Sequence, residues 1–419
     1  MRHATRLLVT ILLACVSVTA QTPLAPAWSQ ERAARIDAVF NQYVDDGRLP
    51  GAVLLVQQDG KTVYERAFGW ADREASRRMT PDALFRIASQ SKAITATAAM
   101  ILMEEGKLLL TDPVSKYIPS FAKTTVAVRT DKGVEIVPAK RQITLRDLLS
   151  HTAGVSYGTE SRVSELYAAK GFGPAAGFGW YFADKDEPIC DSIDRLGTLP
   201  FVAQPGEAWV YGYGNDIMGC VIERVSKQPL DVFIRERITA PLRMNDTFFF
   251  VPRDKASRLA TVYASGADGK AVRAEAGAKG QGAYVEGPRR NFSGGAGLVS
   301  TVEDYARFLE MIRRGGVLDG VRIISPGSAA LMTVNAAGTL HSGGMPGGLG
   351  YSIAFETTEA FGGNGFSHAG AFGWGSAYGA VYRVDPVDKL TMIFEMQLMP
   401  NSTDLREKFP NLVYQALVR

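Results

Sequence analysis

The sequence predicts an α+β fold in which one antiparallel sheet is built from both ends of the chain. Strand patterns occur near the N-terminus, at 52–69, and near the C-terminus, at 355–397. Between them, the chain from about 112 to 245 consists mostly of helical patches and loops rich in glycine and proline. A sheet flanked by helices, with a mainly helical lobe inserted between its halves, satisfies this order. The cleft between two such lobes is the usual place for a site.

The first elements are a helix and a hairpin. Residues 31–47 have helical spacing and end at Gly47. Residues 52–69 are typical of two strands joined by Asp59-Gly60, a strong hairpin signal.

The later elements complete the predicted sheet. A helix around Ser89 stops near Gly106, the C-terminal strands turn tightly near Asp385, and 403–418 has a helical pattern. We therefore expect an α/β lobe formed by about 31–85 and 290–419, and a helical lobe formed by about 86–289.

Residues 1–20 resemble a secretory signal. Arg2 and Arg6 precede an apolar run that ends in V-T-A before Gln21. We expect cleavage, a single folded domain over 21–419 and a periplasmic or secreted location. An uncleaved anchor, or a lipoprotein acylated at Cys15, is the alternative. An exported chain could pair Cys190 with Cys220, and two unpaired buried thiols are the other possibility.

Composition excludes several classes of partner. The net charge is +3, and loss of two arginines with the signal leaves a nearly neutral chain. Nothing therefore indicates a nucleic-acid or anionic-membrane partner. The remaining histidines are His151, His341 and His368, and the sequence has no H-x-x-x-H or C-x-x-C, so we expect no metal and no cofactor.

Ser89 and Lys92 form an S-x-x-K motif within an apolar, alanine-rich run. On a helix, positions i and i+3 share a face, so the lysine can reach the serine oxygen. A helix N-terminus favours negative charge, and burial makes a lysine a better base. Ser120 and Lys123 repeat the spacing without a helix pattern behind them, so helical context favours the first pair.

A second serine motif competes with the first. "GVSYG" (154–158) fits G-x-S-x-G, the nucleophile elbow of α/β-hydrolases, with Ser156 as nucleophile and His368 as a downstream base. That elbow needs a strand before the serine, whereas "TLRDLLSHTAG" looks like a helix. An ordinary glycine turn is the better interpretation.

Two downstream stretches identify the first serine motif. "PGEAWVYGYGNDIMG" (205–219) contains Tyr211, and "GAFGWGSAYGAVYRVDP" (370–386) contains a W-G-S triplet. With the S-x-x-K motif, these resemble the serine β-lactamase and penicillin-binding-protein superfamily, and most closely the class C β-lactamase-like carboxylesterases of family VIII. The resemblance covers about residue 31 to the C-terminus. It implies a β-lactamase/transpeptidase-like fold.

The resemblance implies a role for each motif. Ser89 would be the nucleophile, and Lys92 would take its proton, alone or with Tyr211 as a coupled pair. The backbone N–H groups of Ser89 and Ala377 would form the oxyanion hole. Around them, the third motif would line the site with Trp374, Gly375 and Ser376.

Several positions depart from the family pattern. Tyr213 begins a competing Y-x-N, and His368 begins an H-x-G that would make Ala371 the second oxyanion donor. The sequence has no K-x-G, the lysine of which faces the antibiotic carboxylate in β-lactamases, so neutral esters are favoured. The stretch 171–184 is either a flap over the acyl pocket, with Phe178, Trp180 and Tyr181 as contacts, or a packed loop.

The sequence therefore predicts an exported serine hydrolase that cleaves small carboxylic esters through an acyl-enzyme, without a cofactor. The expected partner is a small ester, with β-lactams as a further possibility, and no nucleic acid or stable membrane insertion. The alternatives are a β-lactamase or D-alanyl-D-alanine carboxypeptidase, and a penicillin-binding-like sensor that acylates without turnover.

Overall fold

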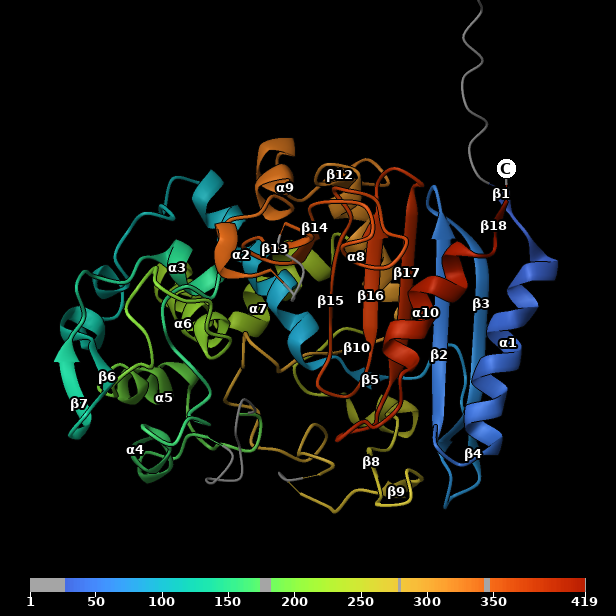
Figure 1. The fold of residues 1–419 in the computed structure, drawn as a ribbon, viewed down its shortest axis with the longest axis horizontal. Helices are drawn as coiled ribbons and strands as arrows, with labels where there is room; N and C mark the ends of the chain where they lie inside the picture. Colours follow the sequence, from blue (N-terminus) through green and yellow to red (C-terminus); the bar gives the residue numbers. More distant parts are fainter. Residues whose placement is uncertain (1–26, 174–181, 278–279, 343–346, 419) are drawn as a thin grey trace, which may run out of the picture.

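A computed structural model describes residues 27–173, 182–277, 280–342 and 347–418. At its centre is an eight-stranded antiparallel sheet of order β13-β14-β15-β16-β17-β2-β3-β4 (Figure 1). The strands are β2 Gly51–Gln58, β3 Lys61–Asp72, β4 Arg77–Arg78, β13 Leu349–Tyr351, β14 Glu356–Thr358, β15 Phe372–Gly375, β16 Val381–Asp385 and β17 Leu390–Met396.

The two ends of the chain meet where β17 pairs with β2. Their register runs from Leu390 opposite Gln58 to Met396 opposite Ala52. The hairpin between β2 and β3 turns at Asp59 (φ 50°) and Gly60 (φ 76°), and two positive φ angles are what a type I′ turn requires. The predicted α+β fold, with a sheet from both ends, is confirmed.

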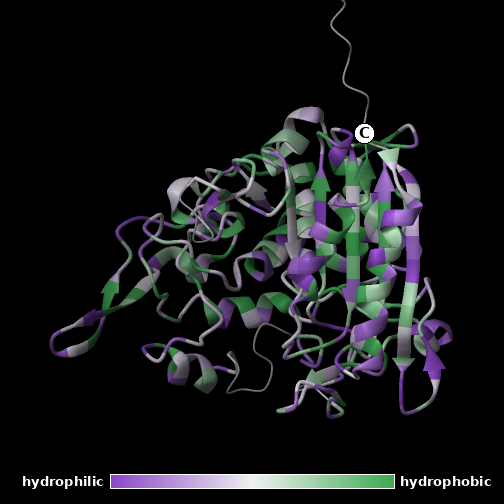
Figure 2. Cartoon of the chain, turned by 45° about the vertical axis from the view of Figure 1, so that its right-hand side comes forward, coloured by the Kyte–Doolittle hydropathy of each residue, from purple (hydrophilic) through white to green (hydrophobic). Residues whose placement is uncertain are grey.

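Both faces of the sheet are buried, because alternate residues of a strand point to opposite sides. Leu54 of β2 and Phe394 of β17 pack on the side of α1 (Gln30–Asp45) and α10 (Leu405–Tyr414). Val53 and Leu55 face the larger core that includes α8 (Val302–Arg313). Hydrophobic residues accordingly run along the central strands of the sheet (Figure 2).

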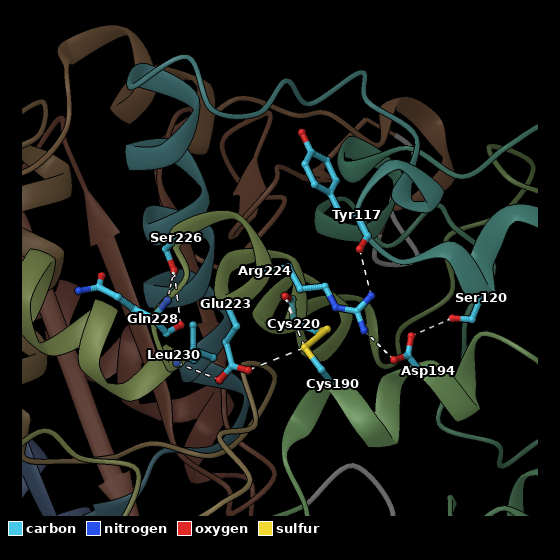
Figure 3. Close-up of a disulfide and its surroundings, with 10 residues drawn as sticks. All are labelled: Tyr117, Ser120, Cys190, Asp194, Cys220, Glu223, Arg224, Ser226, Gln228 and Leu230. Atoms are coloured by element: carbon cyan, nitrogen blue, oxygen red, sulfur yellow. Dashed lines mark hydrogen bonds and ion pairs between the residues drawn. A yellow bond between two sulfur atoms is a disulfide. The ribbon is translucent and has the colours of Figure 1, made fainter.

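The helical region lies beside the sheet and centres on α6, which contacts α2, α3, α5 and α7. Cys190 of α5 and Cys220 of α6 form a disulfide (Figure 3). Of the two possibilities that the sequence left open for these cysteines, the structure therefore has the paired one. The helices are α2 Ser91–Glu104, α3 Leu145–Leu149, α4 Ser164–Ala169, α5 Ile189–Leu196, α6 Gly214–Ser226, α7 Leu230–Ile234 and α9 Pro326–Met332.

The longest hairpin outside the main sheet was not predicted. Strands β6 (Thr125–Thr130) and β7 (Gly133–Pro138) pair with each other and lie at the outer edge of the helical region (Figure 1). The remaining short strands are β1 Ala27–Trp28, β5 Phe85–Arg86, β8 Tyr263–Ser265, β9 Ala271–Arg273, β10 Val299–Ser300, β11 Val317–Leu318, β12 Val321–Arg322 and β18 Leu417–Val418.

The remaining helical turns are short. They are η1 Ala88–Gln90, η2 Val114–Lys116, η3 Pro119–Lys123, the π-helical η5 Arg235–Thr239, η6 Arg253–Arg258 and η7 Gly338–Leu340.

Two predictions concern residues outside the described ranges. The signal segment 1–20, with Cys15, is one. The flap contacts Phe178, Trp180 and Tyr181 are the other. Within the described ranges, no helix has the length and apolar character needed to span a membrane.

Candidate active site

Residues from the helical region and from β15 meet at a pocket of about 250 Å³. All three predicted motifs contribute to its wall or lie directly behind it. The lining residues are Ser89, Tyr157, Tyr211, Trp374, Gly375, Ser376, Ala377 and Arg406.

Ser89 is presented to this pocket by a buried helix. Between Ala83 and Leu102 it is the one residue that is not buried. It lies in η1, which runs directly into α2, and the N–H groups at a helix start lack intrahelical acceptors and favour negative charge. The preceding Ala88 has φ 42°, a conformation that costs a non-glycine residue energy and persists only when its surroundings impose it.

Lys92 lies one helical turn further on and is 1% exposed. Its Nζ donates to Gly295 O at 2.7 Å, to Tyr157 Oη at 3.1 Å and to Ser89 Oγ at 3.2 Å. These three acceptors match the three N–H groups of an ammonium. After losing one proton, the same nitrogen can direct its lone pair at the serine hydroxyl.

A buried carboxyl lies behind Lys92. Asp216 Oδ1 accepts from Ser293 Oγ at 2.5 Å and from Gly295 N at 3.1 Å. Burial raises the pKa of Asp216 to about 6, although Ser293 and the nearby Lys92 charge oppose this shift. A Cβ at position 295 would lie 2.3 Å from Asp216 Oδ2, so glycine is required there. At neutral pH the carboxylate thus supports the backbone that anchors Lys92.

Tyr157 is the site residue that the sequence did not reveal. It follows Ser156 in the "GVSYG" stretch, for which an ordinary glycine turn was the preferred interpretation, yet its hydroxyl is bonded to Lys92. Burial raises the pKa of Tyr157 well above its usual range, and neighbouring Tyr211 adds to this, so it remains a neutral phenol. No motif in the sequence marked this tyrosine as a site residue.

Tyr211 reaches the site in a different way. Its hydroxyl accepts from Trp374 Nε1 at 3.0 Å, and Lys92 Nζ lies 4.7 Å from the centre of its ring. The buried ring of His151 packs 4.6 Å away on another side, and burial lowers the pKa of His151, which keeps that ring neutral. Lys92 therefore meets the face of Tyr211 and the hydroxyl of Tyr157.

The W-G-S segment forms the opposite wall of the pocket. Ser376 is buried, its N–H donates to Ala380 O at 2.9 Å, and its Oγ accepts from Tyr378 N at 3.2 Å. Ser376 thus shapes the turn after β15. Among the described residues, the N–H of Ala377 donates to no protein acceptor, so it is free to serve as the predicted oxyanion donor.

Arg406 of α10 adds a cation that the motifs did not predict. A Cβ at Gly375 would lie 2.3 Å from Arg406 Nη2, so the guanidinium packs directly on the W-G-S backbone. The pocket therefore contains a positive charge despite the absence of K-x-G.

The structure does not bring Tyr213 or His368 into this pocket. Tyr213 is fully buried against Phe172, Phe182 and Tyr157, and its hydroxyl accepts from Gly173 N at 3.3 Å.

His368 lies at the other end of the β15–β16 pair. Its Nδ1 is 2.9 Å from Asp385 Oδ2 and 3.5 Å from Asp388 Oδ2. Tyr414 Oη and the His368 backbone N–H also donate to Asp385. His368 therefore belongs to a hydrogen-bonded cluster of the fold and does not line the pocket.

The two competing serines have structural partners. Ser156 Oγ donates to Glu160 at 2.6 Å and follows α3, so the required strand–serine–helix elbow is absent. Ser120 Oγ donates to Asp194 at 3.3 Å in the cluster shown in Figure 3, while Lys123 is exposed. Each of these serine hydroxyls is bound to a carboxylate of the fold, and neither serine lines the pocket that contains Ser89.

The chain is similar to several known proteins. A family model described as Beta-lactamase matches residues 36–416. Protein Rv1367c of Mycobacterium tuberculosis is 34% identical over 382 residues, covering 87% of this chain and 90% of that protein. Esterase EstB of Burkholderia gladioli is 33% identical over 371 residues, covering 84% and 87%. The solved structure of EstCE1, a hydrolase with promiscuous acyltransferase activity, superposes with a TM-score of 0.74 at 26% identity, covering 92% and 98%.

Proposed function

Because the chain belongs to the β-lactamase family and is a serine hydrolase of the esterase and acyltransferase type, we propose that it is an exported carboxylesterase for small esters. The observation that carries the proposal is Ser89, exposed at the start of a buried helix and bonded to Lys92 inside the pocket. The esterase activity named for EstB and the hydrolase activity named for EstCE1 support the choice of substrate class.

The reaction proceeds in two halves. Lys92, as a neutral amine, accepts the Ser89 proton while Oγ attacks the ester carbonyl, and the oxyanion is bound by backbone N–H groups at Ser89 and Ala377. Collapse breaks the bond to the alkoxide, which leaves as the alcohol with the proton from Lys92. Water then attacks the acyl-serine and gives its proton to the same lysine, and the acid leaves while Ser89 Oγ recovers a proton.

Tyr157 and Tyr211 have separate places in this scheme. The Tyr157 hydroxyl holds the Lys92 amine, and its neutral state allows it to relay a proton without adding charge. The Tyr211 hydroxyl lines the pocket and is oriented by the Trp374 indole, a position suited to the leaving-group oxygen.

A β-lactam is the second candidate substrate, since Arg406 gives the pocket a cation that a carboxylate can meet. The test is a panel of p-nitrophenyl esters of increasing acyl length plus nitrocefin, on wild type, Ser89→Ala and the control Ser156→Ala. We expect ester turnover to disappear only in Ser89→Ala. Full activity in that variant overturns the proposal. Nitrocefin turnover that matches ester turnover reassigns the enzyme as a β-lactamase, and a persistent acyl adduct without turnover supports a sensor.

Export is supported by the signal pattern at 1–20 and by the Cys190–Cys220 disulfide, a bond favoured in oxidising compartments. Fractionation of a bacterial host with intact-mass measurement tests it. We expect a chain that begins at Gln21, in the periplasm or medium, with both cysteines resistant to alkylation. A full-length cytosolic chain with two free thiols contradicts export.

A further inference from the structure

A second carboxyl is buried next to the nucleophile and is not used by the scheme above. Glu395 lies on the central strand β17 and is 1% exposed. Gln90, the residue after Ser89, donates from Nε2 to Glu395 Oε1 at 2.6 Å. The two atoms left over, Gln90 Oε1 and Glu395 Oε2, are buried and have no hydrogen-bond partner among the described residues.

No positive charge compensates Glu395. Within the described ranges, no lysine, arginine or histidine forms an ion pair with it, and Arg86, which leads into the same turn, donates to Gln397 and to backbone carbonyls instead. Burial, opposed only by the Gln90 bond, raises the pKa of Glu395 to about 8. A buried carboxylate without a cation is costly, and gaining a proton removes that cost.

The other groups around Glu395 are neutral. Tyr305 of α8 interacts with Glu395 and donates its hydroxyl to Gln90 O at 2.9 Å. Tyr382 of β16 packs on Tyr305, with 5.1 Å between ring centres. Burial raises the pKa of both phenols well above their usual range, and Val53 opposite on β2 is apolar. The surroundings thus suit an uncharged acid.

We propose that Glu395 is protonated in the resting enzyme and forms a two-bond acid–amide pair with Gln90, which fixes the nucleophile turn to the central sheet. In this pair Gln90 Nε2–H donates to Glu395 Oε1, and the Glu395 Oε2 hydroxyl donates to Gln90 Oε1. One proton therefore satisfies both orphaned atoms. Glu395 is a positioning residue, because it acts on Ser89 only through Gln90.

The pair has a consequence for a strained segment. Ala88, two residues before Gln90, has φ 42°, and such a conformation persists only where neighbouring groups impose it. Gln90 is held by its side chain to β17 and by its carbonyl to α8. These two contacts fix the position of the turn that carries Ser89.

Alkaline pH breaks the pair. Loss of the Glu395 proton places a carboxylate oxygen against the amide oxygen of Gln90, so both atoms become acceptors without a donor. The folded state binds this proton more tightly than the unfolded chain, where the carboxyl titrates near 4.5. The contribution of this group to stability is therefore greatest in acid and declines as pH rises toward about 8. We expect activity to fall reversibly over the upper part of this range.

The main test is Glu395→Gln, because a glutamine amide can form the same two-bond pair and cannot titrate. We expect near wild-type kcat for p-nitrophenyl acetate at pH 7 and loss of the alkaline fall near pH 8. Glu395→Leu leaves the Gln90 amide unpaired and should lower kcat about tenfold at every pH. The control is Asp304→Asn, which neutralises another buried carboxyl. Burial raises the pKa of Asp304 to about 6, so this variant should leave the fall of kcat near pH 8 unchanged. An unchanged alkaline fall in Glu395→Gln overturns the proposal.

The activity readout rests on the proposed ester hydrolysis, so a second measurement is independent of substrate. Infrared spectra of the wild-type protein should contain a protonated-carboxyl band that disappears with a midpoint near pH 8 and is missing in Glu395→Gln. An ionised carboxyl at pH 7 overturns the pair, even if no variant folds. Absence of esterase activity together with the titrating band rejects only the substrate class.

Discussion

The two S-x-x-K segments of this protein have the same spacing and opposite surroundings. Ser89 and Lys92 lie in a continuous helical segment that is buried as far as Leu102. Before Leu102, Ser89 is the one residue of this segment that is not buried, and it faces the pocket. Ser120 and Lys123 lie in η3, a surface 3₁₀ turn, where the serine contacts Asp194 and the lysine extends outward. The S-x-x-K spacing alone therefore decides nothing about reactivity.

The difference arises from residues distant in sequence. Lys92 is anchored by Gly295 O and Tyr157 Oη, with the Asp216 carboxyl behind it. Asp194, in contrast, gathers Ser120 and Arg224 into a surface cluster beside the disulfide (Figure 3). The first set supplies a desolvated base and the second a structural contact. Single substitutions in each segment test this comparison.

The largest expected effect is loss of the buried lysine. Lys92→Met keeps an unbranched side chain as far as Cε and removes the amine that acts as the base, so kcat/KM should fall about a thousandfold. Lys123→Met is the matched control and should retain wild-type kcat/KM. Steady-state kinetics on one p-nitrophenyl ester, with circular dichroism to confirm folding, provide the measurement. Equal losses in both variants mean that the structural distinction between the segments has no catalytic meaning.

A smaller effect distinguishes the two tyrosines beside Lys92. Tyr157→Phe removes the hydroxyl bonded to the amine, and Tyr211→Phe removes the one bonded to Trp374. Each should lower kcat about a hundredfold. Because both groups act around one lysine, the double variant should lose much less than the product of the two. Wild-type kcat in Tyr157→Phe restricts the proton route to Lys92 and Tyr211.

The sequence predicted the parts of the fold that depend on local pattern. Asp59-Gly60 specified the β2–β3 turn, because that turn needs two positive φ angles. Strand patterns at both ends implied the shared sheet. The β6–β7 hairpin was missed because it lies in the region expected to contain helical patches and loops, next to the second S-x-x-K segment, where only the absence of a helix pattern was noted.

The site was predictable where motifs exist and unpredictable where contacts are long-range. The resemblance predicted Ser89, Lys92 and Tyr211, and the structure places Ser89 and Tyr211 at one pocket with Lys92 bonded to Ser89. Tyr157 was missed because its link to Lys92 crosses 65 residues of chain, and no spacing rule predicts such a contact.

The placement of His368 depended on strand register. Gly375 opposes Val381 and Phe372 opposes Val384, so residues that precede β15 lie toward Asp385, away from the pocket. The H-x-G triplet is visible in the sequence, but the register of β15 against β16, which decides where His368 lies, could not be predicted from it.

The smallest expected effect is at the second serine. Ser120→Ala removes one partly buried 3.3 Å hydrogen bond to Asp194, which also binds Arg224 at 2.6 Å. The free energy of unfolding should fall by at most about 1 kcal/mol, with kcat/KM unchanged. Urea denaturation measures the first quantity, and Asp194→Ala, which removes both contacts, should cost more. A fall in kcat/KM for folded Ser120→Ala means that the surface segment influences the pocket, and the contrast between the two segments then fails.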